Sequence, residues 1–376
     1  MAQLNHETTT GDVLSAYLQG QATEFLRSLR LHRESTTDAQ GAEDSLEAAR
    51  ALRRAARRIG GTLHTFRPLL DQEWAAGLRP ELAWLCGTLA REHAYAARLD
   101  RLLDALHRLS GTPQVPAPVT ADVASAAAVG KTAAGAQPAP AAVGRRSAGR
   151  NGWAQPTPRG ADDQGSTPRG LTVGAAKAAA LLERQLTLAR TRAHSAALQA
   201  FGSSRFHAVA DNVAVLASEV PLARAFEDLK PLAARAEEEL AEAVAALPLG
   251  QAGHPYNAEA LTHGLASDTD AAPEAQDAPW LQTRALLRLH RYAREVLIGS
   301  PDDDPRLAEA SHALDRHRDA ADAASAAASA ARTPRIAPAT AYALGVLHAD
   351  QRHEVEAARF TFHQAWLRET EAVSTP

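Results

Sequence analysis

The 376-residue sequence contains one cysteine, Cys86, and only 5% of its residues are aromatic. A single cysteine excludes an intrachain disulfide, and within Trp84-Leu85-Cys86-Gly87 it is typical of a small core side chain rather than a catalytic thiol. The first residues lack a basic region followed by an apolar run, and no apolar stretch is long enough to span a bilayer. These absences favour a cytoplasmic protein without a membrane partner.

Lysine is also scarce, because the 40 basic residues include only Lys131, Lys177 and Lys230. The rest are arginine, the better bidentate partner for phosphate, although high-GC codon usage would produce the same bias. The formal net charge is -4. The chain as a whole therefore does not attract nucleic acid or acidic membranes, and anion binding would depend on local clusters of charge.

Alanine is the commonest residue, and hydrophobic residues make up 45% of the chain. Few aromatics and many alanines favour closely packed helices over sheets, whose strands prefer β-branched and aromatic residues. A chain of this length can bury one large core or two modest ones. We therefore predict an all-α protein with two helical bundles.

Apolar residues at helical spacing divide the chain into two helical halves, 9–111 and 171–371. The helices expected in the first half are 9–30, 44–66 and one that ends near Ser110. The helices expected in the second half are centred on 181–188, 206–216, 233–247, 279–298, 305–331 and 338–368.

Between the halves, residues 112–170 are rich in proline, alanine, glycine, serine and threonine. Such a composition cannot bury enough apolar surface to fold, so we expect a disordered linker. Its scattered arginines could hold an anion loosely, but a passive connection is the favoured interpretation.

The helix expected at 44–66 carries five arginines within one sector and apolar residues on the opposite side. The five are Arg50, Arg53, Arg54, Arg57 and Arg58. Like charges three and four residues apart cost about 0.2 to 0.5 kcal/mol per pair, or about 1 to 2 kcal/mol in all. A bound polyanion would offset that cost, and a solvated charged face is the alternative. A second, weaker set on one face follows at Arg284, Arg288 and Arg291.

These segments resemble the CHAD domain, the conserved-histidine α-helical domain of inorganic polyphosphate biology. Ala49–Ile59 (ARALRRAARRI) and Thr65–Leu70 (TFRPLL) resemble its first signature, and Arg284, Arg288 and Arg291 with Tyr292 resemble its second. Shorter matches lie at Trp74, 82–85, 204–206, 317–320 and 342–345.

Several signature positions differ from the family pattern. Arg50 stands in place of the first histidine and Leu281 in place of the second, while Gly60 and Leu289 replace basic residues. An acidic motif after Trp84 is also lost, with Arg91-Glu92-His93 nearby. The family's fold is therefore better implied than its full affinity for polyphosphate.

The resemblance implies two pseudo-symmetric antiparallel helical bundles whose basic helices line a central groove. It also implies inorganic polyphosphate as the partner, with polyphosphate granules as an expected location, and binding without catalysis or a cofactor. The implied binding residues are Arg50, Arg53, Arg54, Arg57, Arg58, Arg284, Arg288 and Arg291. We expect the two sets to face one another, and reversal of charge at Arg57 and Arg58 to weaken binding without unfolding the chain.

Two other functions stay open: a diverged structural or interaction protein that has lost the ligand, and a phosphohydrolase. The second would need a metal cluster on the final helix, among His348, Asp350, His353, Glu354 and Glu356. The two histidines are five residues apart and diverge by about 140° on a helix, unlike the i, i+4 pair of a metal-binding helix. His312 and His317 share that spacing, so we expect no metal site. No phosphate loop or nucleophile motif is present either.

Overall fold

The computed structural model describes residues 10–35, 42–111, 169–223, 228–253, 273–298 and 304–373. Within these ranges the chain is helical, without a β-strand, and the predicted all-α fold is confirmed. The helices are α1 Thr10–Ser35, α2 Ala42–Thr65, η1 Arg67–Leu69, α3 Gln72–Ser110, α4 Arg169–Phe201, α5 Ser204–Ser218, α6 Leu229–Ala245, α7 Leu249–Ala252, α9 Pro273–Ile298, α10 Pro305–Ala331 and α11 Pro338–Val373.

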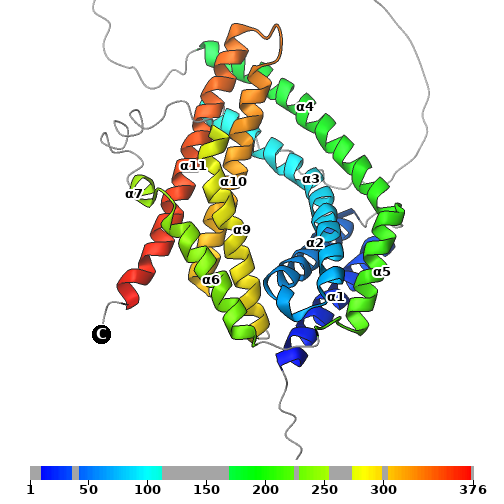
Figure 1. Ribbon diagram of the computed structural model, residues 1–376. Coiled ribbons are helices and arrows are strands. Elements are labelled where there is room, and N and C mark those ends of the chain that lie inside the picture. Colours follow the sequence, from blue (N-terminus) through cyan, green and yellow to red (C-terminus); the bar gives the residue numbers. More distant parts are fainter. Residues whose placement is uncertain are drawn as a thin grey trace, which may run out of the picture.

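The helices form two bundles, as expected (Figure 1). One contains α1, α2, α3 and α5, and the other contains α6, α9, α10 and α11, while α4 runs along α3 from the α11 end to α5. The expected linker, 112–170, lies outside the described residues except for its last two, which begin α4. Because α4 and α5 follow it and pack on α3 and α1, the division into halves at 9–111 and 171–371 stays a prediction.

Three clusters of buried side chains hold these bundles together. The first joins α1, α2, α5 and the N-terminal half of α3 to the adjacent ends of α6 and α9. The second joins the C-terminal half of α3 to α4, α10 and α11, and the third lies among α6, α7, α9, α10 and α11. The buried apolar side chains therefore form three separate clusters, and α3 contributes to two of them.

Alanine allows close packing of α10 against α11. In α10, Ala320, Ala323 and Ala327 are fully buried and pack toward α11, where Ala343 is also buried. Small side chains let two helix backbones approach and leave little conformational entropy to lose. The many alanines of the sequence thus allow α10 and α11 to pack closely against each other.

Two helix starts differ from the sequence prediction. Helix α9 begins at Pro273, so Pro279 lies inside it rather than at its first turn. A proline inside a helix removes one backbone hydrogen bond, and here tertiary contacts of Asp277 and Trp280 hold the preceding turn in place. Helix α2 begins at Ala42, two residues before the expected start at residue 44. No helix within the described ranges has an apolar segment sufficient to traverse a bilayer.

Candidate anion-binding site

Helix α2 sets the direction of the arginines by burying its other face. Leu52, Ile59 and Leu63 are all 0% exposed in the first cluster. Because these residues recur every three to four positions, Arg53 and Arg57 are turned to the opposite side, one turn apart. Apolar packing in one bundle therefore presents a cationic surface toward the other bundle.

Close approach of α2 and α9 brings the two basic helices together. A Cβ atom on Gly61 would lie 2.6 Å from Tyr292 Cδ2 and 3.3 Å from Leu289 Cδ2. Only glycine leaves room for the tyrosine ring at this crossing. The ring also lies beneath Arg58, whose Cζ atom is 5.7 Å from its centroid. The contact fixes the spacing of the two arginine sets.

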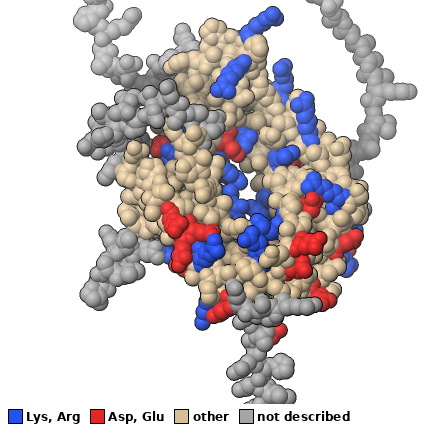
Figure 2. Space-filling model, in the orientation of Figure 1, with Lys and Arg blue, Asp and Glu red and all other residues tan. Residues whose placement is uncertain are grey.

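A pocket of about 360 Å³, which we call the central pocket, lies between α2, α3 and α10. Figure 2 shows a hollow in the middle of this face with basic side chains gathered on its walls. Arg53 and Arg57 enter the pocket from α2, and small residues of α3, Gly87, Ala90 and Ala94, form its floor. The residues lining it are Arg53, Arg57, Cys86, Gly87, Ala90, His93, Ala94, Ala97, Arg98, Arg101, Arg318, Asp319 and Asp322.

Like charges accumulate beside this pocket. Burial, followed by the positive charges of Arg284 and Arg57, lowers the pKa of Arg288 to about 10. Burial and the charge of Arg57 also lower the pKa of Arg53. Arg288 on α9 and Arg57 on α2 therefore repel each other across the bundle interface, and among the described residues Arg53, Arg57 and Arg288 have no carboxylate partner. An anion would relieve this repulsion.

Arg58 occupies a different environment from Arg57. Its Nε and Nη2 atoms donate to Glu295 at 2.7 and 3.2 Å, and Tyr17 Oη donates to the same carboxylate at 2.8 Å. Burial and the charge of Glu295 raise the pKa of Tyr17, so its hydroxyl keeps the proton. Arg58 thus ties α2 to α9 by an ion pair and does not present a free cation to a ligand.

Most of the other predicted binding arginines, like Arg58, pair with a carboxylate. Glu47 contacts Arg50 at 3.5 Å and Arg54 at 2.8 Å, so one carboxylate on α2 pairs with both arginines. Arg284 pairs with Asp315 on α10. Arg291 has a buried Nε without a hydrogen-bond partner among the described residues and does not line the central pocket.

Sequence analysis missed three arginines of the central pocket. Arg98 and Arg101 lie one turn apart on α3 and pair with α10 and α11 through Asp322 at 2.6 Å and Glu354 at 3.5 Å. Arg318 lies beside Asp319, with which it pairs. Arg318 lies within the 317–320 match to the family, whereas Arg98 and Arg101 lie outside all of the matched segments.

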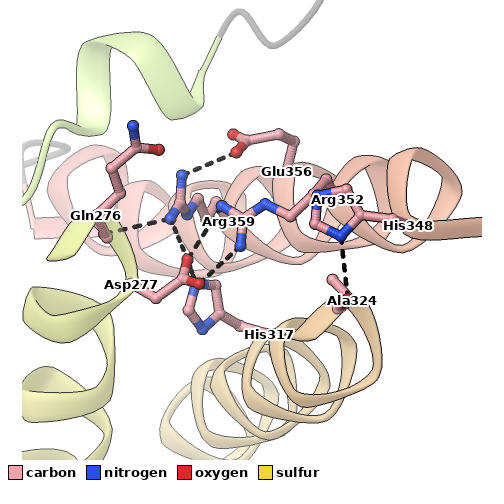
Figure 3. Close-up of polar contacts among 8 residues, drawn as sticks. All are labelled: Gln276, Asp277, His317, Ala324, His348, Arg352, Glu356 and Arg359. Atoms are coloured by element: carbon pink, nitrogen blue, oxygen red, sulfur yellow. Dashed lines mark hydrogen bonds and ion pairs between the residues drawn. The ribbon is translucent and has the colours of Figure 1, made fainter. Parts of the chain in front are cut away.

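A buried polar network links α9, α10 and α11 (Figure 3). Asp277 accepts hydrogen bonds from Arg352 at 2.6 Å and Arg359 at 2.7 Å, and His317 Nε2 lies 3.4 Å from it. Burial alone would raise the pKa of Asp277, but its contacts with His317 and Arg352 hold it at about 2. Burial lowers the pKa of His317. Since the network holds His317 in place and Arg318 is the next residue of α10, the network also restricts the position of the Arg318 backbone.

The histidines considered for a metal site have other contacts. His348 Nδ1 lies 3.0 Å from the backbone oxygen of Ala324, and His317 belongs to the Asp277 network. The part of the chain that the structure describes contains no group of three or more metal-ligating side chains.

The helical architecture agrees with comparisons to known proteins. The family model for the CHAD domain matches residues 20–329, and the chain belongs to this family. The resemblance inferred from the arginine signatures is confirmed. The chain is similar to a solved structure, PptA from Streptomyces chartreusis, with 56% identity and a TM-score of 0.69 over 95% of this chain and 99% of that chain. No curated protein matches the sequence.

Proposed function

We propose that this protein binds inorganic polyphosphate in the central pocket without converting it chemically. The observation that carries the proposal is a group of partially buried guanidinium groups without carboxylate partners among the described residues. Arg53 and Arg57 line the pocket, and Arg288 lies outside its lining but close enough to Arg57 for the two charges to repel. Guanidinium groups bind phosphate bidentately, and closely spaced cations from two bundles match a ligand with one charge after another along its chain. Membership of the CHAD family supports the same ligand, and recruitment to polyphosphate granules in the cytoplasm would follow from it.

Carboxylates at the edge of the pocket limit the number of cations available. Asp319 and Asp322 lie in its lining and pair with Arg318 and Arg98. A polyphosphate chain has to compete with these acids for two of the arginines. We therefore expect Arg53, Arg57 and Arg288 to make the first contacts, and the loss of the signature histidines to leave affinity low for the family.

The test is a titration with long-chain polyphosphate at two salt concentrations. We expect Arg57→Gln and Arg288→Gln each to weaken binding about tenfold, the scale of one charge-assisted hydrogen bond, and to make the dependence on salt shallower. Arg91→Gln is the matched control, because Arg91 is exposed on α3 and does not line the central pocket. Undetectable binding by the wild type at low salt would favour a structural protein that has lost the ligand, and so would equal losses in all three variants.

A further inference from the structure

A second and larger pocket lies on the other side of Arg53. This outer pocket has a volume of about 610 Å³ and lies between the end of α1, the start of α2, the middle of α3, and α4. Its volume falls within the range of roughly 300 to 1,000 Å³ that is typical of small-molecule sites. Arg53 and His93 line both pockets, so the outer pocket and the central pocket meet at these two residues.

The outer pocket differs from the central pocket in having an apolar wall. Leu46, Leu89, Leu198 and Phe201 line it, and Leu46 and Leu198 are 45% and 54% exposed. Inorganic polyphosphate has no apolar surface with which to cover these side chains. A ligand that gains from this wall must carry an apolar or aromatic body as well as any negative charge.

Positive charge occupies the side of the outer pocket nearest the central pocket. Arg50 and Arg53 enter from α2, and Arg190 enters from α4, where it lies 4.0 Å from Glu92. Burial and then the charges of Arg50 and Arg53 lower the pKa of His93, which shows that cationic groups converge on this point. A ligand in the outer pocket would direct its anionic end toward Arg53.

Polar side chains at the remaining edge of the outer pocket favour a ligand with an aromatic heterocycle over a ligand with an alkyl chain. His32 Nδ1 lies 3.0 Å from Ser45 Oγ, and His194 Nδ1 lies 2.9 Å from Glu92 Oε2. The ring of His32 also lies against Phe201, with centroids 4.6 Å apart. These groups can exchange hydrogen bonds with ring nitrogens and exocyclic amines, which an alkyl chain would leave unpaired.

From these observations we propose that the outer pocket binds a nucleoside polyphosphate. The planar base lies against Leu198 and Phe201, its polar edge faces the two histidine pairs, and its phosphates extend past Arg53 into the central pocket. The phosphate end rests on the proposed function, whereas the base site is independent of it. The protein would then distinguish a nucleotide from a plain phosphate chain by the base.

Calorimetric titration with ATP and with inorganic tripolyphosphate tests the proposal, because the two ligands carry the same number of phosphates. We expect the wild type to bind ATP about tenfold more tightly, the lower part of what stacking one base contributes. Leu198→Gln should weaken ATP binding about threefold to tenfold and leave tripolyphosphate and long-chain polyphosphate unchanged. Leu188→Gln is the matched control, since Leu188 is 49% exposed on the same helix but outside the pocket.

Saturation-transfer NMR supplies a direct readout of the bound base. We expect stronger transfer from the protein to the base protons than to the ribose protons, and loss of that difference in Leu198→Gln. ATP binding no tighter than tripolyphosphate, or equal behaviour of Leu198→Gln and Leu188→Gln, would overturn the base site. Failure of long-chain polyphosphate to bind, with the preference for ATP intact, would overturn the proposed function and leave the base site standing.

Discussion

Arg57 and Arg58 are adjacent in sequence, and we predict opposite effects when each is replaced by glutamine. Arg58 pairs with Glu295, whose side chain is only 5% exposed, while the Arg58 side chain is 26% exposed. Removing one partner of a buried ion pair costs about 3 to 5 kcal/mol, because the other charge stays buried. Arg58→Gln leaves the more buried group behind, so we expect a loss of about 3 kcal/mol or more in the free energy of unfolding.

Glu295→Gln should cost less than Arg58→Gln. It leaves the guanidinium of Arg58, which keeps some contact with water and with the Tyr292 ring. Arg57→Gln should be neutral or stabilising by a few tenths of a kcal/mol, because it removes a cation that repels Arg288 and Arg53. The structure thus changes the expectation for Arg58, whose charge cannot be reversed without placing two carboxylates together.

Urea unfolding followed by circular dichroism measures all three variants against the wild type. The order of stability should be Arg57→Gln at or above wild type, then Glu295→Gln, then Arg58→Gln. An Arg58→Gln variant within 1 kcal/mol of wild type, or an Arg57→Gln variant less stable than it, would refute this assignment of the two arginines.

Other predictions concern residues around the pockets and the core. The pKa of Asp277 is about 2, below its ordinary value of 3.8, so Asp277 contributes about 2 kcal/mol of stability above pH 4 that is lost as pH falls from 4 through 2. Unfolding of Asp277→Asn, measured from pH 5 to pH 2, should lack this slope. Burial raises the pKa of the Cys86 thiol to about 11. Alkylation by iodoacetamide should therefore be slow at pH 7.5 and become faster as the pH is raised toward this pKa. Asp319→Asn should free Arg318 and tighten polyphosphate binding severalfold in the same titration. Ala327→Leu should lower the melting temperature, because overpacking costs about 1 to 3 kcal/mol.

The sequence predicted the helices well because helical periodicity is a local property. Leu52, Ile59 and Leu63 follow a spacing that identifies their buried face without knowledge of any partner. Pro279 was misplaced because proline is favoured in a first turn, and the contacts that extend α9 before it come from α11. Local rules therefore identified the elements and missed some of their ends.

The electrostatics of the site could be predicted only in part, because the ion pairs join distant segments. Arg58 and Glu295 are separated by 237 residues, and Arg98 and Asp322 by 224. Nothing near Arg58 in the sequence distinguishes it from Arg57, since both lie on the same sector of one helix. The fold decides which arginine meets a carboxylate and which meets another arginine.

Helix α3 has a consequence for how the molecule opens. With 39 residues it is about 58 Å long, and its two halves are built into different clusters, through Leu82 and Leu85 at one end and Leu102 and Leu106 at the other. If one cluster unfolds while the other stays intact, the half of α3 that belongs to the unfolded cluster loses its packing and becomes exposed to water. Amide hydrogen exchange along α3 should therefore be uniformly slow, and the ends of the molecule should lose their protection together. The floor of the central pocket lies midway along this helix, so a ligand held there resists the opening of both ends at once.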